Sequence, residues 1–115
     1  MSSGGCIFCA IIERHIEAKW IHETESIAVI QDRSPKAPVH YLIIPKIHAA
    51  DVLALQGPLV EKVGSDLLAT ARFLGEQLPS PAAFRLVVNN GKEVGQSVFH
   101  LHLHFLAGKL FNDDV

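Results

Sequence analysis

The spacing of hydrophobic and polar residues predicts five strands. Residues 20–23 and 27–32 indicate two strands joined by a polar turn, and residues 40–44 indicate a third that Pro45 closes. Two more strands are expected over residues 84–89 and 99–106. Because the first three strands follow one another closely, we expect an antiparallel sheet.

Apolar residues at helical spacing predict two helices. A short helix is expected over residues 7–15 and a long one from about Pro58 to Gln77. Pro58 suits the first helical position, where its missing N–H costs nothing, and prolines at 79 and 81 end the element. The apolar stripe of the long helix comprises Leu59, Val60, Val63, Leu67, Leu68, Ala71 and Leu74. These elements predict an α+β fold in one domain, residues 1–115, with the long helix packed on the sheet.

The last predicted strand carries three histidines in alternation with large apolar residues. His100, His102 and His104 would share one face, with successive Cα atoms about 6.6 Å apart. A buried imidazole needs hydrogen-bond partners, so three side by side are a costly way to stabilise a fold. The pattern therefore favours a nucleophile, a metal site or an anion site over a core strand with incidental histidines.

The loop that precedes this strand is polar and rich in glycine. Asn89 to Gly91 and Gly95 to Ser97 flank a short connection. Glycine allows close approach of the backbone to a ligand, and successive N–H groups in a turn can bind an anion. The loop is either a phosphate site beside the histidines or an ordinary hairpin turn.

Composition limits the classes of function. The chain has 115 residues, of which 49% are hydrophobic and 19% charged, with a formal net charge of −2, so it is expected to be globular and not to bind a nucleic-acid polymer. No apolar run reaches the ~20 residues of a membrane span, and residues 1–5 do not resemble a signal peptide, so we expect the cytoplasm. In that compartment Cys6 and Cys9 could bind a metal, act as a redox pair, or be two inert thiols.

Residues 100–106, His-Leu-His-Leu-His-Phe-Leu, resemble the signature of the histidine triad (HIT) superfamily. The resemblance extends over residues 6–109 and is to the Hint-like branch, the purine nucleoside phosphoramidate hydrolases. It implies a HIT-like fold of about five antiparallel strands with one long and one short N-terminal helix. The other matching segments are Ile7-Phe8, 27–32, 34–40, 44–48, Val88-Asn89 and 95–97.

The resemblance implies a role for each polar residue. His102 would attack the α-phosphorus and form a nucleotidyl-histidine, which water then hydrolyses to the nucleoside monophosphate. His104 and Ser97 would hold and polarise the phosphate, and His40 would support the nucleophile. The implied phosphate site comprises Asn89, Gly95, Gln96, Ser97 and His104, and the implied purine nucleoside site comprises Ile7, Phe8, Ile11, Ile30, Asp32 and Arg33.

The resemblance also implies a metal and a quaternary structure. Cys6, Cys9, His48 and His100 would hold a structural Zn²⁺ that the chemistry does not need, as in bacterial members of this branch. The protein would be a homodimer. Animal members end in a tryptophan-containing segment that shapes leaving-group preference, and residues 110–115 contain no tryptophan, so the leaving group stays open.

Two other functions remain open. Two of the triad histidines could bind a catalytic metal, as His-x-His pairs on strands can. Alternatively, the chain could be a nucleotide-binding regulatory or partner protein whose catalysis is incidental.

Overall fold

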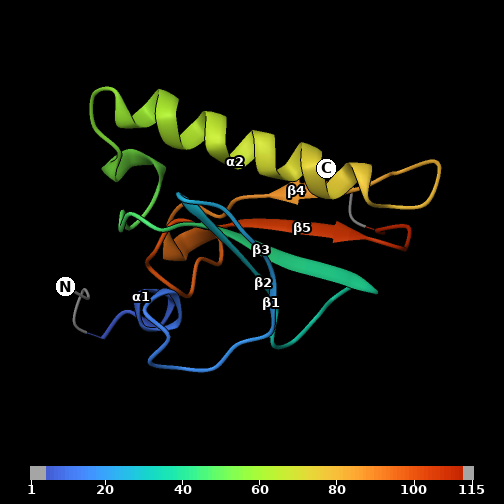
Figure 1. Ribbon diagram of the computed structural model, residues 1–115, viewed down its shortest axis with the longest axis horizontal. Coiled ribbons are helices and arrows are strands. Elements are labelled where there is room, and N and C mark those ends of the chain that lie inside the picture. The colour runs from blue at the N-terminus through green and yellow to red at the C-terminus, as the bar shows by residue number, and fades with distance from the viewer. Residues whose placement is uncertain (1–4, 113–115) are drawn as a thin grey trace.

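The computed structural model describes residues 5–112 and contains one five-stranded sheet (Figure 1). The strand order is β1-β2-β3-β5-β4, and every neighbouring pair is antiparallel. The predicted fold class is therefore confirmed. The strands are β1 (Trp20–Glu23), β2 (Ile27–Gln31), β3 (Val39–Pro45), β4 (Arg85–Val87) and β5 (Leu103–Ala107).

Two α-helices and two short 3₁₀ helices complete the fold. Helix α1 spans Ile7–Ile12 and helix α2 spans Leu59–Glu76, with 3₁₀ turns at Val52–Ala54 and Lys92–Val94. Helix α1 is shorter than the predicted 7–15, because Arg14 has a left-handed φ of 64° and the His15 N–H turns back to the Ala10 carbonyl.

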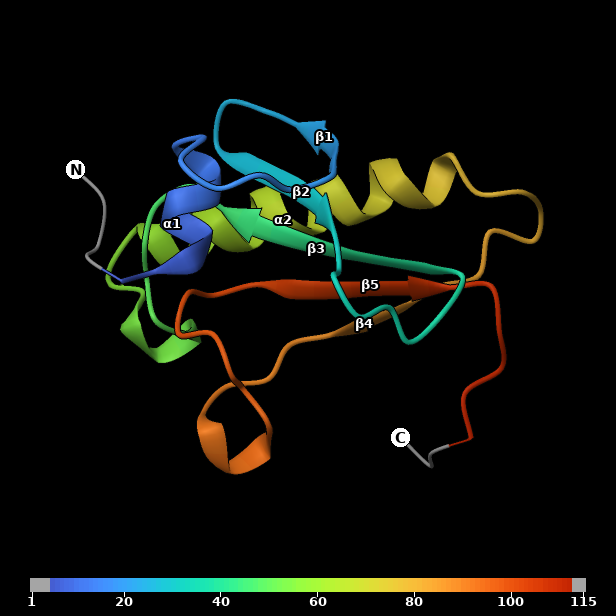
Figure 2. The same ribbon diagram turned by 90° about the horizontal axis from the view of Figure 1, so that it is seen from below.

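The helices cover opposite faces of the sheet, so the molecule has three layers (Figure 2). Alternate residues of each strand point to opposite faces. Ile27, Val29, Ile43 and Phe105 pack under α2, against its Ala71 and Leu74. The other face is packed under α1, by Phe8, Ile11, Ala28, Ile30, Leu42 and Ile44. The short helix is thereby fixed on the face that the histidines share.

The predicted histidine strand begins later than the sequence indicates. Only His104 of the three lies in β5, because the ladder between β3 and β5 ends at the pair Ile43 and Leu103. Before that point the Leu101 N–H donates to the carbonyl of Ala49 and not to a strand. The expectation of a strand over 99–106 was therefore wrong for His100 and His102.

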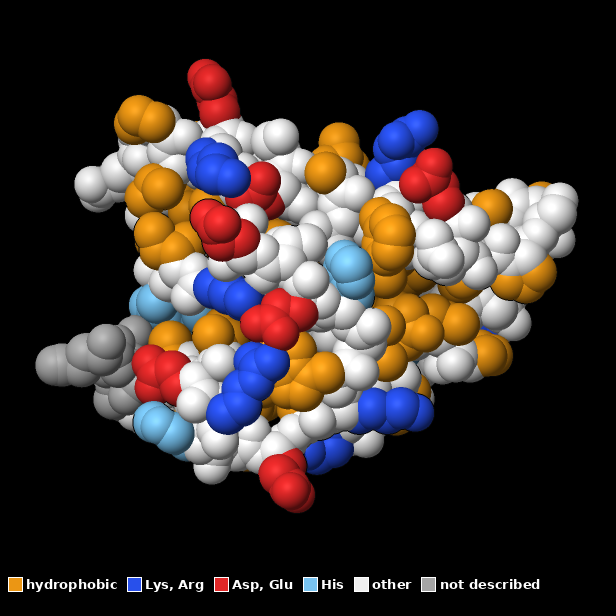
Figure 3. Space-filling model, in the orientation of Figure 1, with side chains coloured by type: hydrophobic (Ala, Val, Ile, Leu, Met, Phe, Trp, Pro, Cys, Tyr) orange, Lys and Arg blue, Asp and Glu red, His pale blue; other side chains and the backbone are white. Residues whose placement is uncertain are grey.

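Part of the apolar stripe of α2 is at the surface. Val63, Ala71 and Leu74 are buried, whereas Leu68 is 63% exposed and Val60 49%. The face seen in Figure 3 carries interspersed acidic and basic side chains, with hydrophobic side chains gathered below the C-terminal half of α2. Over residues 5–112, neither α-helix combines the length and apolar character needed to cross a membrane.

Candidate active site

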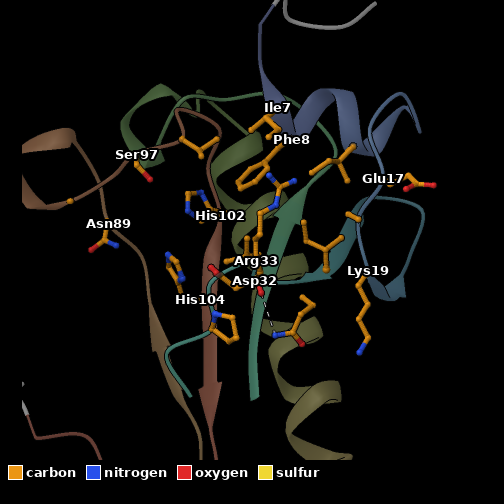
Figure 4. A pocket seen from close by; sticks show the side chains of 18 residues that line it. Ile7, Phe8, Glu17, Lys19, Asp32, Arg33, Asn89, Ser97, His102 and His104 are labelled. Carbon is orange, nitrogen blue, oxygen red and sulfur yellow. Dashed lines mark hydrogen bonds between the residues drawn. The ribbon is translucent and has the colours of Figure 1, made fainter. Parts of the chain in front are cut away.

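A pocket of about 630 Å³ lies between α1, the loop before β5 and the ends of the central strands. Asn89, Ser97, His102 and His104 lie along one side, Phe8 and Arg33 lie across from them, and Asp32 lies close to His104 (Figure 4). The pocket thus joins the predicted phosphate loop, two triad histidines and α1. All six residues expected at the purine nucleoside line it, namely Ile7, Phe8, Ile11, Ile30, Asp32 and Arg33.

Hydrogen bonding fixes the tautomer of His102. Its Nδ1 lies 2.7 Å from the carbonyl oxygen of His100, so Nδ1 carries the proton and donates it. The Nε2 atom then has the lone pair of a ring that lines the pocket. The edge of the Phe8 ring holds the imidazole, with ring centroids 5.0 Å apart. His102 therefore presents an unprotonated nitrogen from a ring that is fixed in place.

His104 presents the opposite chemistry. The Lys36 N–H donates to Nδ1 of His40 at 3.0 Å, so His40 carries its proton on Nε2. That Nε2 lies 2.9 Å from Nδ1 of His104 and donates to it. His104 consequently carries its own proton on Nε2, which makes it a hydrogen-bond donor for a ligand. We expected His40 to support the nucleophile, and the structure places it against His104.

Burial keeps these histidines neutral. The pKa of His104 is lowered to about 4, chiefly by removal from water and also by the neighbouring His102 and His40 rings, against the opposing effect of the Asp32 carboxylate. Desolvation also lowers the pKa of His102, against the opposing effects of the His100 carbonyl and the Asp32 carboxylate. The pKa of His40 is lowered for the same reason. A neutral imidazole is the form that can attack an electrophile.

The loop of residues 89–97 is organised differently from the predicted anion nest. The Gly95 N–H donates to the Lys92 carbonyl and the Gln96 N–H to the Gly91 carbonyl, so neither is available to a phosphate. The Gln96 side chain is buried and accepts from the Gly91 N–H at 2.7 Å, and it donates to the Ala50 and Val98 carbonyls. Gln96 therefore shapes the loop, and Asn89 and Ser97 are the side chains of the loop that line the pocket.

Sequence patterns did not identify several of the residues that line the pocket. Glu17, Lys19 and Gln31 also line it. Glu17 and Lys19 lie in the connection between α1 and β1, which has no hydrophobic period or motif that would mark them. Only the tertiary packing of α1 on the sheet brings this connection to the pocket.

Four potential metal ligands meet behind the pocket. Cys6 directly precedes α1 and Cys9 lies within it, whereas His48 follows β3 and His100 precedes β5. Their ligand atoms all lie within 4.8 Å of one another. Nδ1 of His100 lies 3.4 Å from Sγ of Cys6 and 3.2 Å from Nδ1 of His48, and Sγ of Cys9 lies 3.4 Å from that same His48 nitrogen. The structure therefore contains a group that could bind a metal.

These separations fit the donor set of a tetrahedral zinc site. Zinc bond lengths imply about 3.6 Å between a sulfur and a nitrogen ligand and about 3.3 Å between two nitrogens. Nε2 of His100 lies 2.7 Å from the Pro45 carbonyl and donates to it, so the Nδ1 lone pair is directed to the cluster. Four protein ligands of this type are typical of closed structural sites and leave no position for a substrate.

Comparisons with known proteins agree with the geometry. The model of a family described as HIT domain matches residues 13–110. The chain is 45% identical over 107 residues to an uncharacterized HIT-like protein of Chlamydia trachomatis, covering 90% of this chain and 93% of that protein. The solved structure of a HIT family hydrolase from Clostridium thermocellum is similar with a TM-score of 0.91 and 36% identity, over 99% of both chains. A hypothetical histidine triad nucleotide-binding protein from Sulfolobus tokodaii is similar with a TM-score of 0.78 and 30% identity, over 95% of this chain and 71% of that one.

Proposed function

This chain belongs to the HIT domain family and resembles its hydrolases, and from that premise we propose that it hydrolyses purine nucleoside phosphoramidates. It would belong to the Hint-like branch and release a nucleoside monophosphate through a nucleotidyl-histidine intermediate. The observation that carries the proposal is the pairing of two tautomers in one pocket. His102 offers a lone pair on Nε2, and His104 offers a proton on Nε2.

The first chemical step uses His102 as the nucleophile. Its Nε2 attacks the α-phosphorus and forms a P–N bond, while the bond from phosphorus to the substrate amine breaks. The electron pair of that bond stays on the amine nitrogen, which takes up a proton that Ser97 or His104 relays from solvent. Nδ1 of His102 keeps its hydrogen bond to the His100 carbonyl, which stabilises the positive charge that develops on the ring.

The second step restores the enzyme. Water attacks the phosphorus and releases a proton to solvent, the bond to Nε2 of His102 breaks with its electron pair returning to Nε2, and the nucleoside monophosphate leaves. The His104 N–H, with Ser97 and Asn89, would bind the phosphate oxygens in both steps. Because His40 holds His104 by a 2.9 Å hydrogen bond, its role in this proposal is to orient that donor.

The nucleoside would occupy the rest of the pocket. Ile7, Phe8, Ile11 and Ile30 provide apolar walls for a flat purine base. The Asp32 carboxylate lines the pocket between these walls and the histidines, where it can accept hydrogen bonds from the ribose hydroxyls. Arg33 also lines the pocket and can stack its planar guanidinium on the base.

Zinc would have a structural role. Cys6, Cys9, His48 and His100 would hold the ion, which would cross-link α1 to the ends of β3 and β5 without contacting the substrate. A bound Zn²⁺ supplies fold stabilisation in such closed sites. The nearby His102 would benefit because the ion fixes His100, whose carbonyl holds its ring.

A homodimer is the quaternary structure that we propose. Strand β4 is at an edge of the sheet, and Leu68 of α2 and Phe84 beside β4 are exposed. These side chains, with Ala71, Gly75 and Ala82, line an apolar depression that joins α2 to the β4 edge. Burial against a second copy would remove this surface from water.

Two other functions are less well supported. Asp32, His40 and His104 also lie close enough to hold a metal, but a proton lies between the two histidines in their 2.9 Å hydrogen bond. This arrangement favours a proton-donating His104 over a catalytic metal ligand. A purely nucleotide-binding protein would not require the free lone pair that His102 presents in the pocket.

Release of AMP from adenosine 5′-phosphoramidate tests the proposal. We expect the wild-type protein to turn this substrate over, His102→Ala to abolish turnover, and the exposed control His15→Ala to retain it. Turnover by the wild type should survive a chelator in a short assay, since zinc takes no part in the chemistry. Binding of AMP without turnover would favour the nucleotide-binding alternative, and loss of activity to the chelator alone would favour the metalloenzyme.

A further inference from the structure

A second pocket, of about 610 Å³, adjoins the first. The two pockets share Asp32, Asn89 and His104. The second pocket extends from these residues along β4 and under the segment that follows β5, where Phe111 and Asn112 line it. A ligand whose phosphate contacts His104 and Asn89 could therefore enter both pockets.

The two pockets differ in charge. Lys36 and Lys109 line the second pocket, and among the described residues Asp32 is the one carboxylate that lines it. Arg85 also lines this pocket, where it lies over Phe111. The first pocket has Lys19 and Arg33 against Glu17 and Asp32, so its charges balance. Over the described residues the second pocket is thus the more cationic of the two, although the whole chain has a net charge of −2.

Local contacts keep these cations at the pocket. The Arg85 guanidinium lies over the Phe111 ring at 4.5 Å, and Nζ of Lys109 lies 5.6 Å from the same ring centroid. Nζ of Lys36 donates to the Ser34 carbonyl at 3.2 Å, in the loop after β2 that also carries Asp32. Arg85 and Lys109 therefore contact the same aromatic ring, and Lys36 reaches the pocket from a different loop.

The geometry of phosphoryl transfer indicates which pocket holds the attacking atom and which holds the leaving group. The attacking and leaving atoms lie roughly in line on opposite sides of phosphorus. His102 lines the first pocket and not the second, so the attacking nitrogen belongs to the first pocket. A leaving group on the side away from His102 would pass His104 and Asn89, which line both pockets.

We propose that the second pocket binds the leaving group and selects one that carries a negative charge, a carboxylate or a phosphate, near Lys36 and Lys109. This inference rests on the proposed hydrolase function and adds the substrate class to it. The substrates would be nucleoside phosphoramidates of acidic amines. Lys36 and Lys109 are binding residues that leave the bond-breaking step to the histidines.

Four AMP phosphoramidates with leaving amines of similar length provide the test. Their amines are γ-aminobutyrate, aminoethyl phosphate, γ-aminobutyramide and putrescine, which end in a carboxylate, a phosphate, a neutral amide and a cation. We expect kcat/KM for at least one anionic amine to exceed that for the neutral amide about tenfold, because each exposed charge pair contributes a few-fold. The comparison of carboxylate with phosphate identifies which anion the pocket prefers.

Substitutions connect the preference to the pocket. Lys109→Gln should reduce the ratio of anionic to neutral kcat/KM several-fold, and Lys109→Glu should reverse it in favour of putrescine. A protein that lost activity through misfolding would lose all four substrates together and would not reverse its preference. The matched control Lys62→Gln, in a lysine of α2 that pairs with Asp66, should keep the wild-type ratio.

The outcomes separate this inference from the proposed function. Equal turnover of anionic and neutral substrates would overturn the leaving-group inference and leave the hydrolase intact. A preference that Lys109→Glu does not change would also overturn it. Turnover of none of the four substrates, nor of adenosine 5′-phosphoramidate, would overturn the hydrolase proposal and this inference with it.

Discussion

At the scale of single residues, three identical side chains acquire three different chemistries from their hydrogen bonds. His100 donates from Nε2 to the Pro45 carbonyl, and its Nδ1 faces the other three potential metal ligands, Cys6, Cys9 and His48. His102 donates from Nδ1 and presents an Nε2 lone pair, whereas His104 accepts at Nδ1 and presents an Nε2 proton. The sequence could predict that the histidines act together, but the tautomers depend on the carbonyls of Pro45 and His100 and on His40. Those partners are fixed only by the fold.

The pH dependence of catalysis follows from the environment of His102. Burial lowers its pKa below the ordinary 6.5, so the neutral, nucleophilic ring persists into more acid solution. We expect the acid limb of kcat/KM for adenosine 5′-phosphoramidate to be centred below pH 6.5. Asp32→Asn removes a carboxylate that raises this pKa, so it should move the acid limb further down in pH. An acid limb centred at or above pH 6.5 would contradict the burial argument.

Gln96 offers a test of how the loop of residues 89–97 is held. Gln96→Ala would leave the Gly91 N–H and the Ala50 and Val98 carbonyls without their buried partner, at a cost of about 1–3 kcal/mol in the free energy of unfolding. Because Asn89 and Ser97 belong to the same loop, kcat/KM should also fall, by about tenfold or more. Urea unfolding and steady-state kinetics measure the two effects. The exposed glutamine variant Gln56→Ala should show neither, and an unchanged rate in Gln96→Ala would mean that the loop positions no phosphate ligand.

At the scale of elements, hydrophobic periodicity predicted most of the sheet and both helices. It misplaced the start of β5, because alternation of apolar and polar residues continues from Phe99 while the β3 ladder ends at Leu103. In that interval the His100 side chain bonds instead to Pro45 at the end of β3, and the Leu101 backbone bonds to Ala49 in the segment that follows β3. Periodicity reports which face a side chain occupies, whereas strand ends depend on the neighbouring strand. Glu17 and Lys19 could not be predicted from the sequence either, because only the packing of α1 on the sheet brings them to the pocket.

The metal group makes a prediction about helix α1. This helix has only six residues, and isolated helices of that length are unstable, so cross-linking through Cys6 and Cys9 would stabilise its position. We expect about one zinc per chain by plasma mass spectrometry, and Cys9→Ala should lose most of it. The same variant should have a lower melting temperature, with a smaller proportional loss in the chemical rate. His15→Ala, outside the group, should keep its zinc, and an unchanged metal content in Cys9→Ala would remove the proposed zinc site.

At the scale of the whole molecule, the two faces of the sheet have separate tasks. The α1 face holds the pocket, the four potential metal ligands and the triad histidines, and the α2 face holds the larger apolar core. Part of the apolar surface of α2 is exposed to solvent in the single chain. Leu68, which lies beside Ala71, Gly75 and Phe84, is 63% exposed. Close packing in this region is already tight, since a Cβ at Gly75 would lie 2.6 Å from the Phe84 ring.

If this surface is the dimer interface, two matched leucine variants should differ in oligomeric state. Full burial of a leucine side chain contributes about 1.5–3 kcal/mol, and a buried glutamate without a partner would oppose association. We therefore expect the wild type to sediment near twice its 12.6 kDa chain mass, and Leu68→Glu to sediment as a monomer. Leu53→Glu replaces a leucine that is 83% exposed on the 3₁₀ turn at Val52–Ala54, and it should remain a dimer. Because the active-site pocket lies on the opposite face of the sheet from α2, a Leu68→Glu monomer should keep its metal group. A wild type that sediments at the single-chain mass at micromolar concentration would show that the exposed face of α2 is not a dimer interface.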